Sequence, residues 1–371
     1  MQSGPGRAKF IAASLVAVVG AIVAVRAVTA AAALRPSADP RLRVPTLGPI
    51  QTVDENDVGD PFVLNVPAGI KPPSNLPFMN TGPDAYVSAP WNAASVSAAE
   101  RTGWYVLFGT TDWQSNVPTA VSTDRVHWTQ APDALPQLPS WALPTISKTW
   151  APAALRAGST WILYFSTEEA SSQLECIGRA VAASPTGPYV DNSPAPMLCQ
   201  RSLGGSIDPS LVTSSGTRYL TWKSDGNSSG KPDFLWSQKL SPDGLSLLGV
   251  PHQLLTSSAS WTKGIVEAPA MVPSTGGGYW LFYSGGGWDS NRYGTGIAHC
   301  ATVTGPCSAV GDGPYLSTSG SLISPGGLET FTAHDGRLWV AFTALIVVPS
   351  TWHPSRYYYN RVLDIAPMLT R

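Results

Sequence analysis

The sequence predicts an all-β chain folded as a five-bladed β-propeller. Five short aromatic strands recur along the chain, and their last aromatic residues are 57, 57, 61 and 59 residues apart. A regular period of this length is typical of propellers and solenoids, and each unit has room for about four short strands, as a propeller blade requires. No segment beyond the N-terminus shows a sustained helical period, which favours the all-β class. The last aromatic residues are Phe108, Phe165, Trp222, Tyr283 and Phe342.

Residues 1–34 are predicted to be a secretory signal peptide or an uncleaved membrane anchor. Two basic residues precede an apolar run at residues 11–25, and small residues follow at positions 30–33. This is the order of charged, apolar and small residues in a secretory signal. Arg26 interrupts the run, which favours a signal over a full span of about twenty apolar residues. Either way, we expect a protein that is secreted or attached to the cell envelope.

Residues 35–50 are rich in proline and are predicted to be a linker, so that the propeller domain spans residues 51–371. The chain has only 13% charged residues and a net charge of -1, which argues against a nucleic-acid binder with its basic stripe. It has 14 tryptophans, more than a core of this size needs, and the surplus is available for a binding surface.

Four cysteines follow the N-terminal segment. An exported protein meets an oxidising compartment in which cysteine pairs close, and four cysteines allow three connectivities. Pairing sequence neighbours gives Cys176–Cys199 and Cys300–Cys307, with buried free thiols as the alternative. The chain has no CxxC motif and no clustered histidines, so we predict no zinc site.

A proline-marked motif stands about fourteen to sixteen residues ahead of the last four aromatic strands. Because the first strand of each propeller blade lines the central channel, we expect these motifs to converge on one mouth of the channel. In the first unit, Asp60 of the motif lies 48 residues before Phe108, so residues 65–102 must contain an insertion. We expect an ordered loop over one face, which could narrow the channel mouth or add subsites.

Three of the motifs place a carboxylate at positions that the spacing makes equivalent: Asp60, Asp208 and Glu267. Glycosidic hydrolysis needs opposed carboxylates, because one carboxylic acid protonates the leaving oxygen while a carboxylate activates water or attacks directly. A third carboxylate nearby can hold the acid protonated, since like charges resist joint ionisation. Asp84 is a rival for Asp60, because it lies nearer to the expected spacing. Asp before Pro also favours turns, which is the structural alternative for Asp60 and Asp208.

Together, the motifs Gly-Asp-Pro-Phe-Val-Leu, Trp-Ala-Pro, Ile-Asp-Pro-Ser and Glu-Ala-Pro resemble those of glycoside hydrolase family 43. The resemblance runs over residues 57–361. It implies a five-bladed propeller that hydrolyses pentose-containing polysaccharide, with arabinan or arabinofuranosides as the first substrate class and xylan or xylosides as the second. It implies Asp60 as general base, Glu267 as general acid, and Asp208 as the residue that tunes and orients the acid. The family inverts at the anomeric carbon, so a water should sit between Asp60 and the sugar.

Other side chains are candidates for holding the substrate. Trp150 and Trp288 are expected near the channel mouth, where an aromatic ring can stack on a sugar, although Trp150 could instead pack in the core. Arg361 resembles a position near the end of the family's last blade that can point into the channel. Lys223 and Asp225 follow the third aromatic strand, where we expect a solvated loop.

The fifth motif departs from the family. Many members have Gly-His there, near a bound calcium or water, whereas this chain has Gly326 and Gly327, and His334 follows only in a later turn. We therefore predict no metal and no cofactor, with an axial calcium as the alternative.

Two other functions compete with the pentose-specific glycosidase. A fructan-acting enzyme on the same fold should show Asn-Asp-Pro-Asn-Gly and Arg-Asp-Pro, and neither occurs here. A non-catalytic carbohydrate-binding propeller at the cell surface is compatible with the missing channel histidine and with the insertion. The leading prediction is a monomeric glycosidase that binds polysaccharide, binds no nucleic acid, and touches a membrane only through its N-terminal segment.

Overall fold

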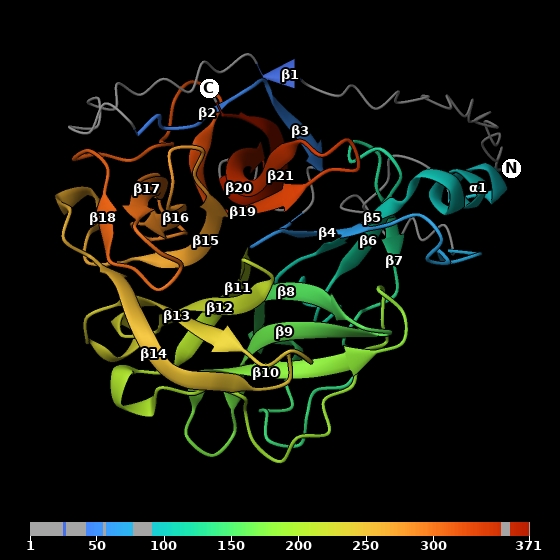
Figure 1. Cartoon of the computed structure of the whole chain (residues 1–371), viewed down its shortest axis with the longest axis horizontal. Coiled ribbons are helices and arrows are strands. Elements are labelled where there is room, and N and C mark those ends of the chain that lie inside the picture. Colours follow the sequence, from blue (N-terminus) through green and yellow to red (C-terminus); the bar gives the residue numbers. More distant parts are fainter. Residues whose placement is uncertain (1–24, 27–41, 55–56, 77–90, 350–356, 371) are drawn as a thin grey trace, which may run out of the picture.

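Five antiparallel sheets form a ring around a central channel in the computed structural model (Figure 1). The structure describes residues 25–26, 42–54, 57–76, 91–349 and 357–370. The predicted signal or anchor therefore lies outside the described residues except for Val25 and Arg26. The first four sheets, each from the channel outward, are β4 (Phe62–Val66), β5 (Trp104–Phe108), β6 (Thr119–Ser122), β7 (Thr129–Ala131); β8 (Thr149–Ala157), β9 (Thr160–Glu169), β10 (Leu174–Ala182); β11 (Ser206–Ser214), β12 (Thr217–Ser224), β13 (Phe234–Leu240), β14 (Leu247–Thr256); and β15 (Glu267–Pro273), β16 (Tyr279–Gly285), β17 (Gly294–Cys300), β18 (Cys307–Ala309).

The fifth sheet closes the ring, because it joins the two ends of the chain. It contains β19 (Ile323–Thr332), β20 (Leu338–Pro349) and β21 (Tyr357–Leu369), and β3 (Ile50–Asp54) pairs with β21 from outside. Two short strands complete it: β1 (Val25–Arg26) pairs with β3, and β2 (Thr46–Leu47) pairs with β21. Residues 42–50, which the sequence analysis placed in the linker, thus lie against the fifth blade, where Ile50 is fully buried.

The innermost strands β4, β8, β11, β15 and β19 contact one another in a closed circle and line the channel. The predicted five-bladed propeller is confirmed. The aromatic strands are the second strand of each blade. Residues Trp104–Phe108 are all buried, because each blade packs between two others and exposes neither face of its second strand.

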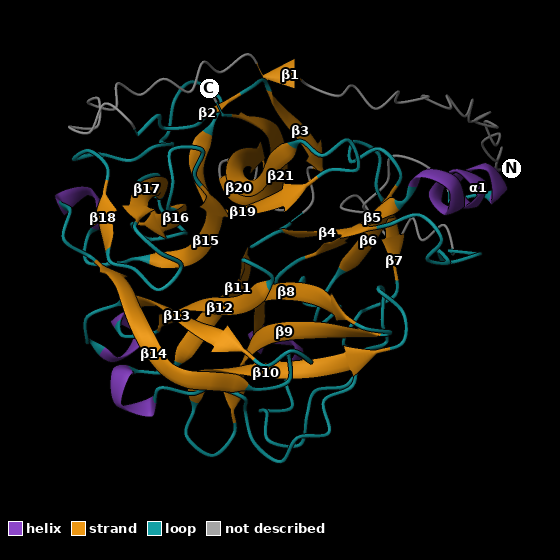
Figure 2. Cartoon of the chain, viewed as in Figure 1, coloured by secondary structure: helices purple, strands orange, loops and turns teal. Residues whose placement is uncertain are grey.

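Helical segments are few, and strands are the main regular structure of the described chain (Figure 2). Helix α1 (Ala93–Thr102) lies at the outer edge of the first blade. The other helical segments are short 3₁₀ turns: η1 (Ile146–Lys148), η2 (Arg201–Leu203), η3 (Asn227–Ser229) and η4 (Ser260–Thr262). In the described parts of the chain, no helix is long and apolar enough to cross a membrane.

The first-blade insertion differs from the expected loop in structure and in place. It contains α1, which Asn92 begins by accepting hydrogen bonds from the backbone of Ala94 (2.9 Å) and Ser95 (3.1 Å). An alanine-rich run after such a cap favours a helix even without strong amphipathic periodicity. The insertion leaves β4 and enters β5 at the ends opposite Asp60, so its described parts do not narrow the channel mouth. Asp84, the rival base, lies outside the described residues.

Both disulfides have the pairing expected from the sequence. Cys176–Cys199 ties β10 of the second blade to the segment before β11, and Cys300–Cys307 joins β17 to β18 in the fourth blade. Both lie away from the innermost strands.

Candidate active site

The first strand of every blade is kinked at the same end, at the residue directly before a proline. This residue has a positive φ, a conformation that costs a non-glycine residue about 1–3 kcal/mol. In the second to fifth blades, the pairing with the next strand also shifts in register here. The kinks turn five short segments toward one mouth of the channel. The residues and their φ values are Asp60 (47°), Ala151 (44°), Asp208 (56°), Ala268 (49°) and Ser324 (53°).

Asp60 and Asp208 share this kinked position, whereas Glu267 lies one residue earlier, before Ala268. The spacing had made the three positions equivalent. Counting residues back from the aromatic strand does not reveal that the turn between β15 and β16, residues 274–278, is longer than the corresponding turns of the second and third blades.

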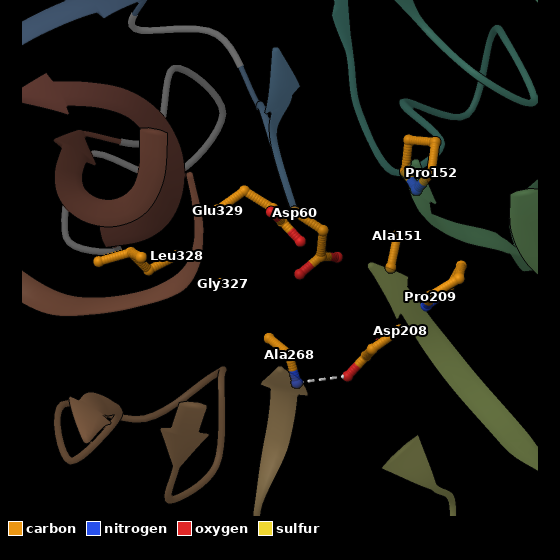
Figure 3. A pocket seen from close by; sticks show the side chains of 9 residues that line it. All are labelled: Asp60, Ala151, Pro152, Asp208, Pro209, Ala268, Gly327, Leu328 and Glu329. Carbon is orange, nitrogen blue, oxygen red and sulfur yellow. Dashed lines mark hydrogen bonds between the residues drawn. The ribbon is translucent and has the colours of Figure 1, made fainter. Parts of the chain in front are cut away.

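A pocket opens where the kinked segments meet (Figure 3). The carboxyl groups of Asp60 and Asp208 point into it from opposite sides, and Glu329 of β19 adds a third carboxyl (Figure 3). All five innermost segments contribute to this one pocket, as the sequence predicted for one mouth of the channel. The lining residues are Asp60, Ala151, Pro152, Asp208, Pro209, Ala268, Gly327, Leu328 and Glu329.

Asp60 is held by the second strand of its own blade. The Thr110 hydroxyl donates to Asp60 Oδ2 over 2.6 Å. Burial raises the pKa of Asp60, and the charges of Glu267 and Asp57 raise it further, while the Thr110 hydrogen bond and the charge of Arg361 oppose the rise. Asp60 therefore gives up its proton at a higher pH than an ordinary aspartate.

Asp208 connects two blades. Its Oδ2 accepts a 2.8 Å hydrogen bond from the backbone N–H of Ala268, directly after Glu267 (Figure 3), and its own N–H donates to Ser166 Oγ over 3.2 Å. Burial, together with the charges of Glu267 and Asp60, raises the pKa of Asp208 well above its ordinary value. Asp208 therefore holds its proton to a higher pH than an ordinary aspartate, as Asp60 does.

Glu267 has a donor on each carboxyl oxygen. Lys223 Nζ lies 3.1 Å from Oε2, and the Tyr293 hydroxyl donates to Oε1 over 2.7 Å. Burial and the charges of Glu267 and Asp60 raise the pKa of Tyr293 well above its ordinary value, so the phenol keeps its proton. The side chain of Glu267 is only 13% exposed, so these two contacts fix its direction.

Lys223 does not lie in a solvated loop, as the sequence analysis expected, but near the end of β12 with its side chain 1% exposed. Its ammonium also lies 3.4 Å from Asp225 and 3.8 Å from Asp233. Burial opposes the charge, but the carboxylates of Glu267 and Asp233 outweigh it and raise the pKa of Lys223. Strand β12 extends through Lys223 because Lys223 pairs with Ile207 in the kinked first strand, β11.

The three predicted substrate-binding side chains differ in their surroundings. Arg361 forms a two-pronged ion pair with Asp57, with 2.6 Å from Nε to Oδ1 and 3.0 Å from one terminal nitrogen to Oδ2. Its guanidinium lies 5.6 Å from the centre of the Trp288 ring, and Trp288 is 58% exposed. Trp150 is half-buried, with Lys148 Nζ 5.7 Å from its ring centre. Arg361 is close enough to Asp60 for its charge to lower the pKa of that carboxyl.

Sequence reasoning missed three polar groups of the site. Thr110 follows the first aromatic strand without a motif, and Tyr293 comes from the loop before β17, which carries no spacing signal. Glu329 had a signal, since an acidic residue in an apolar innermost strand is costly unless it faces the channel. Burial raises the pKa of Glu329 to about 8, although the Ser210 hydroxyl and the Thr330 backbone act to lower it.

The resemblance made an axial calcium the alternative to a metal-free site. Calcium prefers six to eight oxygen ligands. Within the described residues, the one group of three carboxylate, His or Cys ligand atoms within 4.8 Å of one another is Glu169 with the disulfide-bonded Cys176 and Cys199. The pocket carboxyls do not form such a group.

Residues 87–370 match the family model described as glycosyl hydrolases family 43. The chain belongs to this family. The matched span begins after Asp60, so the arrival of Asp60 in the family 43 pocket is an independent observation. A comparison with curated proteins gives no match.

Several solved structures share the fold. A thermostable family-43 glycoside hydrolase is 21% identical with a TM-score of 0.62, and the similarity covers 84% of this chain and 89% of that one. An endo-arabinase from Bacteroides thetaiotaomicron is 17% identical with a TM-score of 0.61, covering 86% and 97%. An exo-1,5-alpha-L-arabinanase from a bovine ruminal metagenomic library is 18% identical with a TM-score of 0.56, covering 84% and 93%.

The approach to Asp208 packs against the backbone of Glu175 in the second blade, a residue with an unusual carboxyl. A Cβ on Gly205, which has a φ of 116°, would lie 2.4 Å from the Glu175 carbonyl oxygen, so only glycine allows this contact. Glu175 is 7% exposed, and neither of its carboxyl oxygens has a hydrogen-bond partner among the described residues. Burial raises the pKa of Glu175 to about 8.

This raised pKa predicts a stability change in Glu175→Gln. The native state holds the proton more tightly than the unfolded chain, so its stabilising effect is full below the ordinary pKa and is lost as pH rises toward 8. At pH 9 the variant should have a free energy of unfolding about 1–3 kcal/mol above the parent, and the gain should vanish near pH 4. Urea denaturation at both pH values measures this. Glu100→Gln, at an exposed position of α1, is the control, and an equal gain at both pH values would contradict the prediction.

Proposed function

We propose that this family 43 protein is an exported inverting glycosidase that acts on pentose-containing polysaccharide. Arabinan or arabinofuranosides are the first substrate class, and xylan or xylosides the second. The observation that carries the proposal is that Asp60 and Asp208 line one pocket, while Glu267 directly precedes Ala268, which lines the same pocket and is hydrogen-bonded to Asp208. The names of similar structures, an endo-arabinase and an exo-1,5-alpha-L-arabinanase, support the order of substrates. The two disulfides and the apolar N-terminal run support export.

Asp60 is the proposed general base. Thr110 occupies Oδ2, which leaves Oδ1 to face Gly327. A Cβ at Gly327 would stand 3.1 Å from Oδ1, so the glycine keeps open the space that a water needs beside this oxygen. Asp60 takes a proton from that water as it attacks the anomeric carbon from the face opposite the leaving group.

Glu267 is the proposed general acid, and its surroundings assign the proton to one oxygen. Lys223 offers only donors to Oε2, so a proton cannot sit there without losing the contact. At Oε1 the partner is the Tyr293 hydroxyl, which can turn its hydrogen away and accept instead. The proton for the leaving oxygen is therefore carried on Oε1.

Asp208 is the proposed modulator of the acid. Its hydrogen bond to the Ala268 N–H fixes the backbone beside Glu267. Because burial and the charges of Glu267 and Asp60 raise its pKa, Asp208 keeps its proton at a pH where an ordinary aspartate is ionised. Arg361, whose charge acts on Asp60, and the exposed ring of Trp288 beside Arg361 are proposed to bind the sugar that is cleaved.

Hydrolysis of aryl arabinofuranosides, aryl xylosides, arabinan and xylan tests the proposal. We expect turnover of at least one arabinoside, with a loss of roughly 10²–10⁴-fold in Asp60→Asn and in Glu267→Gln on the polymer. Asp208→Asn should lower kcat more than it raises KM. If the folded parent binds arabinan by calorimetry, hydrolyses none of the four, and binds as tightly as Glu267→Gln, the protein is a carbohydrate-binding propeller instead.

The Thr110 contact predicts a shift in the acidic limb of the pH–activity profile. The base must be ionised, so kcat/KM falls as pH drops through the pKa of Asp60. Thr110→Val removes a hydrogen bond that lowers this pKa, and the limb should move to higher pH. Thr110→Ser keeps the hydroxyl and should leave the limb near its parental position. An unmoved limb in Thr110→Val would argue that Asp60 is not the base.

A further inference from the structure

In three blades, one residue at the mouth end of the second strand or directly beyond it bridges to the first strand of the next blade. Thr110 Oγ1 accepts from the Ala151 N–H (3.0 Å), Ser166 Oγ from the Asp208 N–H (3.2 Å), and Ser284 Oγ from the Gly327 N–H (2.9 Å). Strand pairing shows that these bridging positions are the same: Ser166 pairs with Trp150, and Ser284 pairs with Glu267, each at the start of the blade's first strand.

Lys223 occupies this bridging position in the third blade, where it pairs with Ile207. An ammonium cannot accept a hydrogen bond, so Lys223 cannot bind the N–H of Ala268 in the way that the hydroxyls bind their neighbours. That N–H donates to Asp208 Oδ2 instead, over 2.8 Å, while the ammonium reaches Glu267 Oε2 over 3.1 Å. Replacing a hydroxyl by an ammonium thus gives two carboxyls of the pocket a fixed partner.

The substitution is expensive for the fold. A buried ammonium must be surrounded by opposite charge, and Asp225 and Asp233 lie beside Lys223 in addition to Glu267. In the same strand, Thr221 joins the same two blades with a neutral hydroxyl, which donates to the Pro269 carbonyl over 3.2 Å. A hydroxyl at position 223 would bridge the blades without this arrangement, so bridging alone does not explain the lysine.

We propose that Lys223 is a positioning residue that aims Glu267 at the leaving oxygen and releases the Ala268 N–H to orient Asp208. Lys223 acts through these two carboxyls and does not contact the sugar. The inference rests on the proposed function of Glu267 as the acid. Loss of Lys223 should therefore lower turnover most on substrates whose leaving group needs protonation.

Lys223→Ser, which restores the hydroxyl of the other blades, tests this. Turnover of arabinan, whose leaving alcohol needs a proton, should fall by about 100-fold. Turnover of a 2,4-dinitrophenyl arabinofuranoside, whose leaving group needs none, should fall by less than about fivefold. Thr221→Val is the matched control, because it removes a neutral bridge between the same strands and should leave the ratio of the two activities at the parental value.

Equal losses on both substrates in Lys223→Ser, or a ratio equally changed in Thr221→Val, would overturn the inference and leave the proposed function standing. Failure of the parent on both substrates would instead count against the proposed function. If Lys223→Ser does not fold by circular dichroism, Lys223→Ser with Asp233→Asn removes an uncompensated charge and is judged by the same ratio.

A second observation concerns Trp113, in the loop after β5 at the mouth. Trp113 is 70% exposed and has a φ of 70°, which is unusual for a bulky residue. The loop is braced, since Thr111 Oγ1 donates to the carbonyls of Ser115 (2.8 Å) and Ile146 (2.6 Å), and Asp112 accepts from the Ser115 N–H (2.6 Å). The backbone of the loop therefore holds the Trp113 indole in solvent, although the positive φ of Trp113 is unfavourable.

The braced loop joins Trp113 to the rim of the pocket. Thr111 N–H donates to the Thr149 carbonyl over 3.0 Å, directly before the half-buried Trp150. Trp113 is three residues from Thr110, which contacts Asp60, so their Cα atoms are at most about 11 Å apart. We infer that Trp113 is a stacking platform for a sugar unit next to the one that is cleaved, because a rigid aromatic face suits the apolar face of a pyranose or furanose ring.

Trp113→Ala tests this second inference, which also rests on the proposed function. Affinity electrophoresis in arabinan should show binding about tenfold weaker than for the parent. kcat/KM on a 4-nitrophenyl arabinofuranoside, too short to reach the loop, should stay within about twofold. Val250→Ala, a 67% exposed residue on the outer strand β14, is the control. Unchanged arabinan binding in Trp113→Ala, or an equal loss in Val250→Ala, would overturn the inference whether or not arabinan is hydrolysed.

Discussion

The site depends on keeping three carboxyl groups together in a buried place. Burial and the neighbouring carboxylates raise the cost of ionising Asp60 and Asp208, and the fold offsets this with Arg361 for Asp60 and with Lys223 for Asp208. Each cation is itself held by further carboxylates, Asp225 and Asp233 for Lys223 and Asp57 for Arg361. Such a charge network is weak evidence for stability, because removing one partner leaves the others uncompensated. We interpret the network as an arrangement that keeps one carboxyl protonated while another is ionised.

The propeller builds this arrangement from a backbone feature that repeats in every blade. Five innermost strands kink at the residue before a proline, and in three blades a hydroxyl at the mouth end of the second strand accepts a hydrogen bond from the backbone of the next blade. A repeat of this kind can change one residue per blade without disturbing the others. Alanine, aspartate and serine all occupy the kinked position, and the bridging position holds a hydroxyl in several blades and an ammonium in one. The reactive side chains thus occupy positions whose backbone conformation the repeat already determines. Strand β3 pairs with β21 and completes the ring that holds these positions.

The fold and the three central carboxyls could be predicted because both leave periodic traces in the sequence. Aromatic second strands recur at a near-constant interval, and the Asp-Pro and Glu-Ala-Pro motifs stand ahead of them. The partners of the carboxyls left no such trace. Tyr293 comes from a loop whose path depends on the packed blades. Lys223 resembles a surface residue in the sequence, and only the structure shows that its side chain reaches Glu267 of the next blade. Helix α1 was missed because its alanine-rich run has weak amphipathic contrast, and the closing role of residues 42–50 depends on where the last strand ends.

The stereochemistry of the first product tests the central claim, that Asp60 and Glu267 work on opposite faces of the sugar with a water between Asp60 and the anomeric carbon. Proton NMR of the earliest anomer released from an arabino-oligosaccharide, recorded before mutarotation, measures it directly. The account predicts an inverted configuration, because a single displacement by water gives one inversion. Release of the retained anomer would contradict the account, since it would require a carboxylate to attack the sugar and form a covalent intermediate.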